Sequence, residues 1–145
     1  MIDDVLVTPL KIIDVPGGDV YHAMKVSDMG FSGFGEAYFS TVDSGVIKAW
    51  KRHREMTMNL IVPVGEIRIV VCDDRGSSKE KYQDVILSRT NYCRLTIPPL
   101  VWVGFMGVSE NMSILLNIAS IPHDNEESDR KEINEIEYDW REDNR

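Results

Sequence analysis

Short runs in which hydrophobic and polar residues alternate fill the chain between Gly35 and Ser120, and residues that favour turns separate the runs. Alternation with a period of two is typical of β-strands that bury one face. The pattern predicts eight strands, over residues 36–41, 46–51, 56–64, 67–72, 84–88, 93–97, 101–107 and 113–120. Eight short strands in close succession predict an all-β domain, built as a sandwich or a barrel.

The chain of 145 residues, 43% of them hydrophobic, is long enough for one domain with one core. We expect this domain to span residues 1–123. Residues 124–145 hold ten acidic and four basic residues, which gives −6 of the total net charge of −8. Such a polar segment buries little by itself, so we expect an acidic, partly ordered C-terminal tail. It carries four apolar residues that could dock it onto the domain, Ile133, Ile136, Tyr138 and Trp140.

The charge of the first 123 residues argues against some partners. These residues carry only −2 (−8 minus −6) and show no dense field of Lys and Arg, so we expect no nucleic acid as a partner. No run approaches the roughly 18 consecutive apolar residues of a membrane span. Residues 1–5 include Asp3 and Asp4 and lack the basic start of a secretory signal. We therefore expect a cytoplasmic protein without membrane contact.

The two cysteines, Cys72 and Cys93, are far apart in the sequence and form no CxxC motif. Without a secretory signal, this spacing favours reduced thiols that act as small buried hydrophobic residues. One disulfide between them stays open as an alternative.

Chemically distinctive residues lie at fixed intervals between Gly45 and Gly65. Five residues separate Gly45 from Lys51, one separates Lys51 from His53, four separate His53 from Met58, and six separate Met58 from Gly65. This spacing resembles the first motif of metal-binding cupins, which reads Gly, five residues, His, one residue, His, three or four residues, Glu, six residues, Gly. The resemblance implies a single cupin-type jelly-roll barrel.

The same motif shows which metal ligands are missing. Lys51 and Met58 stand where the motif has His and Glu. Residues 98–103 are similar to a second cupin motif, P-x-G-x2-H, but Val103 stands at its His. A transition metal needs several N or O donors at about 2.0–2.2 Å, and ammonium, thioether and valine supply none at neutral pH. Only His53 remains, so we expect no metal, no cofactor and no metal-dependent chemistry.

Four segments carry a more specific resemblance, GVIKAWKRH, CDDRGSS, ILSRTN and TIPPLVWVGF in this order. Together they resemble the dTDP-4-dehydrorhamnose 3,5-epimerase family, metal-free cupins that act on sugar nucleotides, over roughly residues 34 to 124. Sugar-nucleotide 3,4-ketoisomerases are similar cupins with an H-x-H pair on the same strand, whose second member matches His53. The resemblance implies a metal-independent epimerase or isomerase of a nucleotide-linked 4-keto-6-deoxy sugar. It also implies a homodimer in which N-terminal strands pair across subunits.

The resemblance assigns two catalytic candidates. The family histidine that removes the proton beside the keto group matches Lys51, whose ordinary pKa near 10.4 leaves it protonated at pH 7. Burial or a cationic neighbour would have to lower that pKa. Strand alternation places Lys51 and His53 on one face and Arg52 and Arg54 on the other. We therefore expect His53 to be the base and Lys51 to stabilise the enolate.

Substrate-binding candidates follow from the same comparison. Lys48 matches the family arginine that contacts the nucleotide phosphates. A lysine keeps the positive charge of that arginine but lacks the guanidinium group, which can bind a phosphate through two parallel hydrogen bonds. Glu36 and Tyr38 match polar ligand-contacting positions on the preceding strand, and Arg75 is either a ligand contact or a structural turn residue. Asn117 lies near the position of the tyrosine acid of the epimerases and cannot perform that step. A cupin that binds a sugar nucleotide without catalysis therefore stays open as an alternative.

Overall fold

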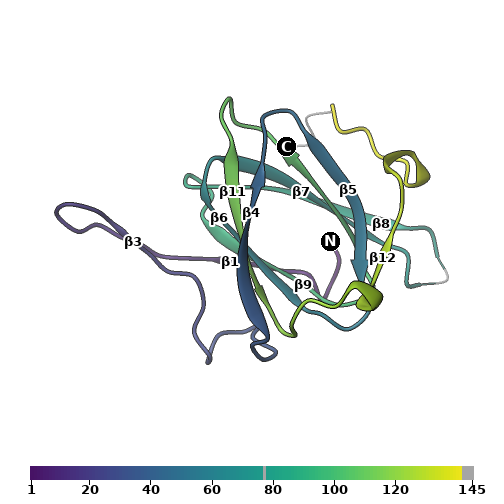
Figure 1. Ribbon diagram of the computed structural model, residues 1–145, viewed down its shortest axis with the longest axis horizontal. Coiled ribbons are helices and arrows are strands. Elements are labelled where there is room, and N and C mark those ends of the chain that lie inside the picture. Colours follow the sequence, from purple (N-terminus) through teal and green to yellow (C-terminus); the bar gives the residue numbers. More distant parts are fainter. Residues whose placement is uncertain (77, 142–145) are drawn as a thin grey trace.

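The computed structural model describes residues 1–76 and 78–141, and its ordered elements are almost all β-strands (Figure 1). Two five-stranded antiparallel sheets have the strand orders β1-β9-β6-β11-β4 and β12-β5-β10-β7-β8. The first holds β1 (Leu6–Pro9), β9 (Cys93–Ile97), β6 (Met58–Val64), β11 (Ser113–Ala119) and β4 (Glu36–Val42). The second holds β12 (Ser128–Arg130), β5 (Ile47–His53), β10 (Trp102–Gly107), β7 (Glu66–Asp73) and β8 (Lys81–Ser88). The fold is the predicted all-β class and a cupin-like jelly roll.

The remaining elements lie at the two ends of the chain. The strands β2 (Ile12–Ile13) and β3 (Val20–Tyr21) form a hairpin that projects from the sheets (Figure 1). Two 3-10 helices, η1 (Asn125–Glu127) and η2 (Ile133–Glu135), flank β12 near the C-terminus. No helix among the described residues is long and apolar enough to cross a membrane.

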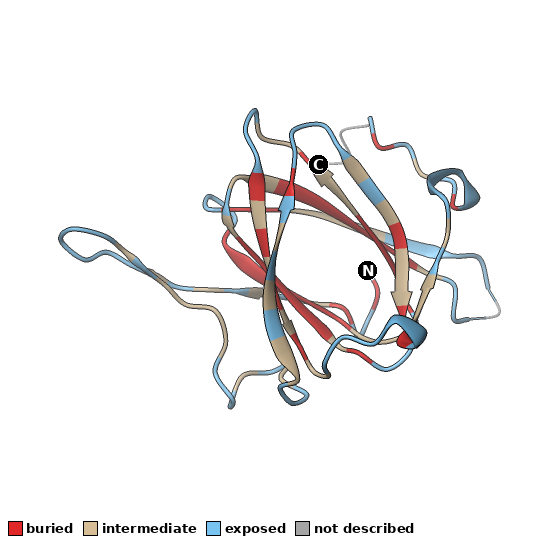
Figure 2. Cartoon of the chain, viewed as in Figure 1, coloured by how far each residue is buried: buried red, intermediate tan, exposed pale blue. Residues whose placement is uncertain are grey.

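The main core lies between the two sheets, where alternate residues of the facing strands meet. Leu60 and Leu95 from the first sheet pack in one cluster with Ile69 and Val103 from the second, and each is at most 1% exposed. Figure 2 shows buried stretches on strands of both sheets, while the projecting hairpin is mostly exposed. Removing alternating β-branched and aliphatic side chains from water is what drives the two sheets together.

Residues of the N-terminal segment cover the outer face of the first sheet. Arg94, on β9 next to the edge strand β1, is fully buried there and donates to the backbone oxygens of Ala23 and Met29 and to the carboxylate of Asp28. This cover explains why all five residues of β9 are buried.

All eight predicted strands are confirmed, with ends displaced by three residues or fewer. Cys72 and Cys93 are free and buried, as predicted. The short strands β1, β2, β3 and β12 were not predicted, because two to four residues are too few to display a period.

The C-terminal segment, residues 124–141, packs along the second sheet. There β12 pairs with β5, and Ile136 and Trp140 join Trp50 and Trp102 in a second apolar cluster. The hydroxyl of Tyr138 also binds this sheet, because it donates to Asp84 over 2.5 Å. Ile133, by contrast, remains 44% exposed. The predicted acidic segment thus contributes the edge strand β12, Ser128–Arg130, to the second sheet. The domain boundary at residue 123 stays a prediction.

A bulge in β5 decides which of its side chains face the space between the sheets. Lys51 lies opposite Val103 and Lys48 lies opposite Phe105, so β5 has one residue more than β10 over this stretch. The extra residue turns both Ala49 and Trp50 towards the outer cluster. Because Val103 and Phe105 belong to the main core, Lys48 and Lys51 share the inner face with it.

Candidate functional site

The candidate site begins with His53, the last residue of β5. Its Nδ1 lies 2.5 Å from Oε1 of Glu127, at the end of η1. The other carboxylate oxygen, Oε2, accepts hydrogen bonds of 3.0 Å from the backbone N–H groups of Glu55 and Met56. His53 is 4% exposed and Glu127 is 7% exposed, so these hydrogen bonds join two side chains inside the protein.

Electrostatics fix the protonation of this pair. Burial lowers the pKa of His53, and the hydrogen bond and charge of Glu127 oppose this only in part. Burial would raise the pKa of Glu127, but the hydrogen bonds from His53, Glu55 and Met56 lower it overall. A neutral imidazole beside an ionised carboxylate carries its proton on Nδ1 and keeps a lone pair on Nε2. With the described residues Nε2 makes no hydrogen bond, so it is free to accept a proton.

Lys51 lies two residues before His53 on the same inner face, as the alternation predicted. Across the ladder from Lys51 is Arg130 of β12, and residues directly opposite each other in an antiparallel pair project to the same face. Burial and the charge of Arg130 lower the pKa of Lys51, against the opposing charge of Glu127. Burial and a cationic neighbour, the two conditions that lower the pKa of a lysine, are thus both present at Lys51.

Tyr38 and Asn117 continue the inner face on the first sheet. They are direct partners in the ladder between β4 and β11, and Nδ2 of Asn117 donates to the Tyr38 hydroxyl over 3.0 Å. The same Nδ2 lies 3.8 Å from the sulfur of Met56, whose backbone N–H binds Glu127. A continuous series of contacts therefore joins the Tyr38 hydroxyl to the His53 pair.

Lys48 and Glu36 also lie on the inner faces of their strands, at some distance from this centre. Lys48 is exposed, and its Nζ donates to the backbone oxygen of Thr41 over 2.7 Å. It precedes His53 by five residues, which is roughly 15 Å along a strand. Glu36 is half-buried at the start of β4 and shares the alternation of Tyr38 and Val42. Lys48 thus shares its strand face with Lys51, and Glu36 shares its strand face with Tyr38.

Arg75 lies in the loop between β7 and β8, and its guanidinium is occupied by two carboxylates. It forms two hydrogen bonds of 2.8 and 2.7 Å with Asp4, and its Nε binds Asp73 over 2.8 Å. These contacts tie the N-terminus to the loop, which favours the structural interpretation of Arg75. Among the described contacts, none joins it to the His53 pair.

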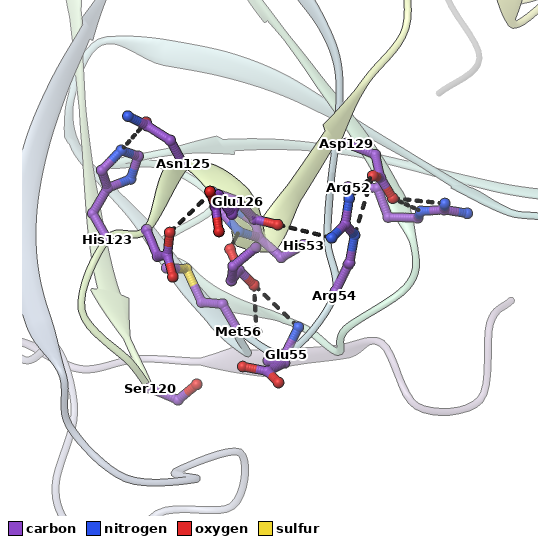
Figure 3. A network of polar contacts seen from close by, with 12 residues as sticks. Arg52, His53, Arg54, Glu55, Met56, Ser120, His123, Asn125, Glu126 and Asp129 are labelled. Atoms are coloured by element: carbon purple, nitrogen blue, oxygen red, sulfur yellow. Dashed lines mark hydrogen bonds and ion pairs between the residues drawn. The ribbon is translucent and has the colours of Figure 1, made fainter.

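On the outer face of β5, Arg52 and Arg54 bind the same carboxylate of β12. Arg52 reaches Oδ2 of Asp129 over 2.7 Å and Arg54 reaches Oδ1 over 2.7 Å (Figure 3). The two guanidinium groups lower the pKa of Asp129 to about 2. Arg52 also stacks over the ring of Trp102, with 4.6 Å between its Cζ and the ring centroid. These contacts fasten β12, which follows Glu127 directly and ends at Arg130.

Glu127 and Arg130 are the functional candidates that the sequence did not indicate. Both lie in the charge-rich segment that was expected to be a tail, 74 residues or more after the residues they approach. One sign in the sequence indicated that this segment packs on the domain, namely its apolar residues. Two of them, Ile136 and Trp140, pack against the second sheet. Among the described residues, no group of three or more His, Cys, Asp or Glu side chains is placed to hold a metal ion.

Comparison with known proteins adds to this geometry. No protein-family model matches the chain. The probable low-salt glycan biosynthesis epimerase Agl13 of Haloferax volcanii is 29% identical over 100 residues, which are 67% of this chain and 64% of that protein. The chain thus spans less than two thirds of the length of this curated relative.

Two solved structures show the same architecture. A dTDP sugar isomerase from Desulfovibrio desulfuricans G20 is 38% identical with a TM-score of 0.90, and the match covers 95% of this chain and 91% of that one. The sugar 3,4-ketoisomerase QdtA from Thermoanaerobacterium thermosaccharolyticum, solved in complex with TDP, is 24% identical with a TM-score of 0.72 and a coverage of 90% of each chain. The second likeness is one of fold.

Proposed function

Because the chain belongs to the dTDP-sugar epimerase and isomerase family, we propose that it is a metal-independent isomerase of a nucleotide-linked 4-keto-6-deoxy sugar. One observation carries this proposal, the buried His53 whose Nδ1 is bound by Glu127 and whose Nε2 is left to act as a base. A histidine that a carboxylate orients in this way is typical of proton transfer.

The proposed reaction begins at the carbon next to the keto group, whose C–H the carbonyl acidifies. His53 removes this proton through Nε2, while Glu127 stabilises the imidazolium that forms. Lys51 provides positive charge where negative charge develops on the carbonyl. Lys48 contacts the diphosphate, and Glu36 borders the sugar.

Tyr38 supplies the acid that Asn117 cannot supply. Because Nδ2 of Asn117 donates to the Tyr38 oxygen, the phenol proton stays available for donation to the substrate. The tyrosine expected near residue 117 would then be replaced by one on the neighbouring strand, held by the asparagine.

Epimerisation and 3,4-ketoisomerisation share this first proton transfer and differ in where the proton returns. The 3,5-epimerase-type reaction is our first candidate. The ketoisomerase is the second, because His53 keeps the second position of the H-x-H pair of those enzymes. A non-catalytic cupin that binds the sugar nucleotide is the third.

The proposal is tested by incubating the protein with dTDP-4-keto-6-deoxyglucose in deuterated water and following mass and sugar NMR. Deuterium at C3 or C5 with inversion supports epimerisation, and a carbonyl moved to C3 supports ketoisomerisation. If neither occurs while dTDP raises the melting temperature, the protein is a binding module. No reaction and no shift with any nucleotide would contradict both readings. A His53→Ala variant that retains turnover would remove His53 from the role of base.

Two further expectations belong to this proposal. We propose a homodimer that uses the N-terminal third of the chain, supported by the number of apolar side chains exposed there. A cytoplasmic location stays a prediction.

A further inference from the structure

We propose that Lys51 forms an imine with the keto group of the sugar, so that the substrate is covalently attached while His53 moves its proton. The inference rests on the proposed function, because it requires a ligand that carries a ketone. It replaces a purely electrostatic role of Lys51 by a covalent one.

The first observation is that Lys51 is a half-buried lysine without a counter-ion. Its Nζ makes no hydrogen bond and no ion pair with residues 1–76 or 78–141. Glu127, the carboxylate whose charge acts on it, is already bound to His53 and to two backbone N–H groups. A lysine placed to act as a permanent cation would normally have a carboxylate partner in a half-buried position.

The second observation is the guanidinium directly across the ladder. Arg130 faces the same side as Lys51, is exposed, and forms no ion pair with the described part of the chain. A second cation beside an amine favours the neutral amine, and burial acts in the same direction, so both lower the pKa of Lys51. Lysines that are desolvated or placed next to a cation are the ones that attack carbonyl groups.

The third observation is the base on the same face of the strand. His53 follows Lys51 by two positions, which is about 6.6 Å between Cα atoms. A carbonyl carbon attached to Nζ of Lys51 would bring the neighbouring C–H group between the two side chains. Nε2 of His53 has no partner among the described residues and is available for that proton.

The chemistry balances without a further reactant. Lys51 gives one proton to solvent and attacks the carbonyl carbon as the neutral amine, so that a C–N bond forms and a carbinolamine results. One proton returns to the carbinolamine, the C–O bond breaks and the oxygen leaves as water, so that the ammonium form and the ketone together give an iminium ion and one water. His53 takes the proton from the adjacent carbon, and the C–H electron pair moves towards nitrogen to form an enamine. Return of a proton to carbon and hydrolysis of the iminium by water release the isomerised ketone and restore Lys51.

Reductive trapping tests the imine. The full-length protein is incubated with dTDP-4-keto-6-deoxyglucose and sodium cyanoborohydride near neutral pH, digested, and analysed by mass spectrometry. We expect a secondary amine between the sugar and Nζ on the peptide that contains Lys51. A His53→Asn variant should still give this adduct, because imine formation precedes proton removal, but it should not exchange deuterium.

Substitution of the lysine separates the covalent role from the electrostatic one. Lys51→Arg keeps the charge and cannot form an imine, so we expect no adduct and a fall in kcat of at least about 100-fold. The control is Lys81→Arg, an exposed lysine at the start of β8, which should react and be trapped like the wild type. A thermal melt close to that of the wild type would show that each variant is folded.

The outcomes distinguish this inference from the proposed function. Wild-type protein that exchanges deuterium but carries no adduct on Lys51, or a Lys51→Arg variant that keeps more than a tenth of kcat, overturns the imine and leaves the isomerase intact. An adduct without exchange supports the imine and contradicts isomerisation. Neither adduct nor exchange in the wild type overturns both.

Discussion

At the scale of single residues, the ability of His53 to accept a proton depends on the hydrogen bond between its Nδ1 and Glu127. A Glu127→Gln variant keeps the shape of the side chain but removes the charge that stabilises the imidazolium. We expect kcat to fall by about 10²–10⁴-fold, the usual contribution of general acid–base catalysis, while KM changes little. Steady-state kinetics with the keto sugar nucleotide measure both.

The neighbouring Glu126 offers a matched control for this change. It lies on the same 3-10 helix and is exposed, so Glu126→Gln should have nearly the kcat of the wild type. Equal rates for the two variants would mean that Glu127 is only a structural residue.

The same pair predicts how activity and stability depend on pH. The pKa of His53 lies below its ordinary value of 6.5 and that of Glu127 lies below 4.5. The unfolded chain therefore binds more protons than the folded one. The stability that His53 contributes is present above pH 6.5 and is lost as the pH falls through the lowered pKa, and that of Glu127 is lost in the same direction below pH 4.5.

We expect the free energy of unfolding to decline as the pH falls below 6.5, and kcat/KM to decline at a lower pH, where the folded protein passes through the lowered pKa of His53. Urea unfolding and initial rates at a series of pH values test this. A His53→Gln variant should lose the part of the stability change that begins near pH 6.5, whereas His123→Gln, at an exposed position, should keep it. A stability curve that rises as the pH falls would contradict the assignment.

The sequence predicted correctly which side chains of one strand share a face. Alternation placed Lys51 and His53 together because the bulge in β5 lies before both of them. It could not find Glu127, because that residue is 74 positions away from His53 and is one of ten acidic residues in a segment without a period. Nothing in the composition distinguishes the one buried carboxylate from its solvated neighbours.

At the scale of elements, the docking of residues 124–141 decides whether Glu127 and Arg130 reach the site. Trp140 is 6% exposed, and its ring centroid lies 5.4 Å from that of Trp50 and 5.1 Å from that of Tyr138. Trp140→Ala should lower the free energy of unfolding by about 3–5 kcal/mol, because a large buried ring is lost. It should also lower kcat, since β12 would be held less firmly. Chemical denaturation and kinetics measure the two effects.

Trp140→Phe retains most of the buried ring and should lose less than half as much stability. If Trp140→Ala unfolds with the free energy of the wild type, the C-terminal segment is not part of the cooperative unit.

The sequence showed the apolar residues of this segment but not the pairing of β12 with β5. The three residues of β12, Ser-Asp-Arg, have no apolar pattern that would indicate a strand. Long apolar strands, by contrast, were predicted from their own residues alone.

At the scale of the whole molecule, exposed apolar side chains are concentrated in the N-terminal third. Of the fifteen large hydrophobic residues exposed in the described part of the chain, eight lie between residues 7 and 39. Phe39 is 69% exposed on β4, which is the edge strand of the first sheet, and Phe34 is 65% exposed just before it. An open edge beside apolar residues favours pairing with a second copy of the chain.

We expect light scattering after size-exclusion chromatography to give twice the chain mass of 16.5 kDa. Replacing Phe34 and Phe39 together by Asp should shift the protein to the mass of one chain at micromolar concentration, because each charge would have to be buried at the interface. The control, Ile133→Asp, changes a side chain that is 44% exposed on the C-terminal segment and should leave the mass unchanged. A wild-type protein that elutes with the mass of one chain would contradict the dimer, and the exposed N-terminal residues would then need another partner.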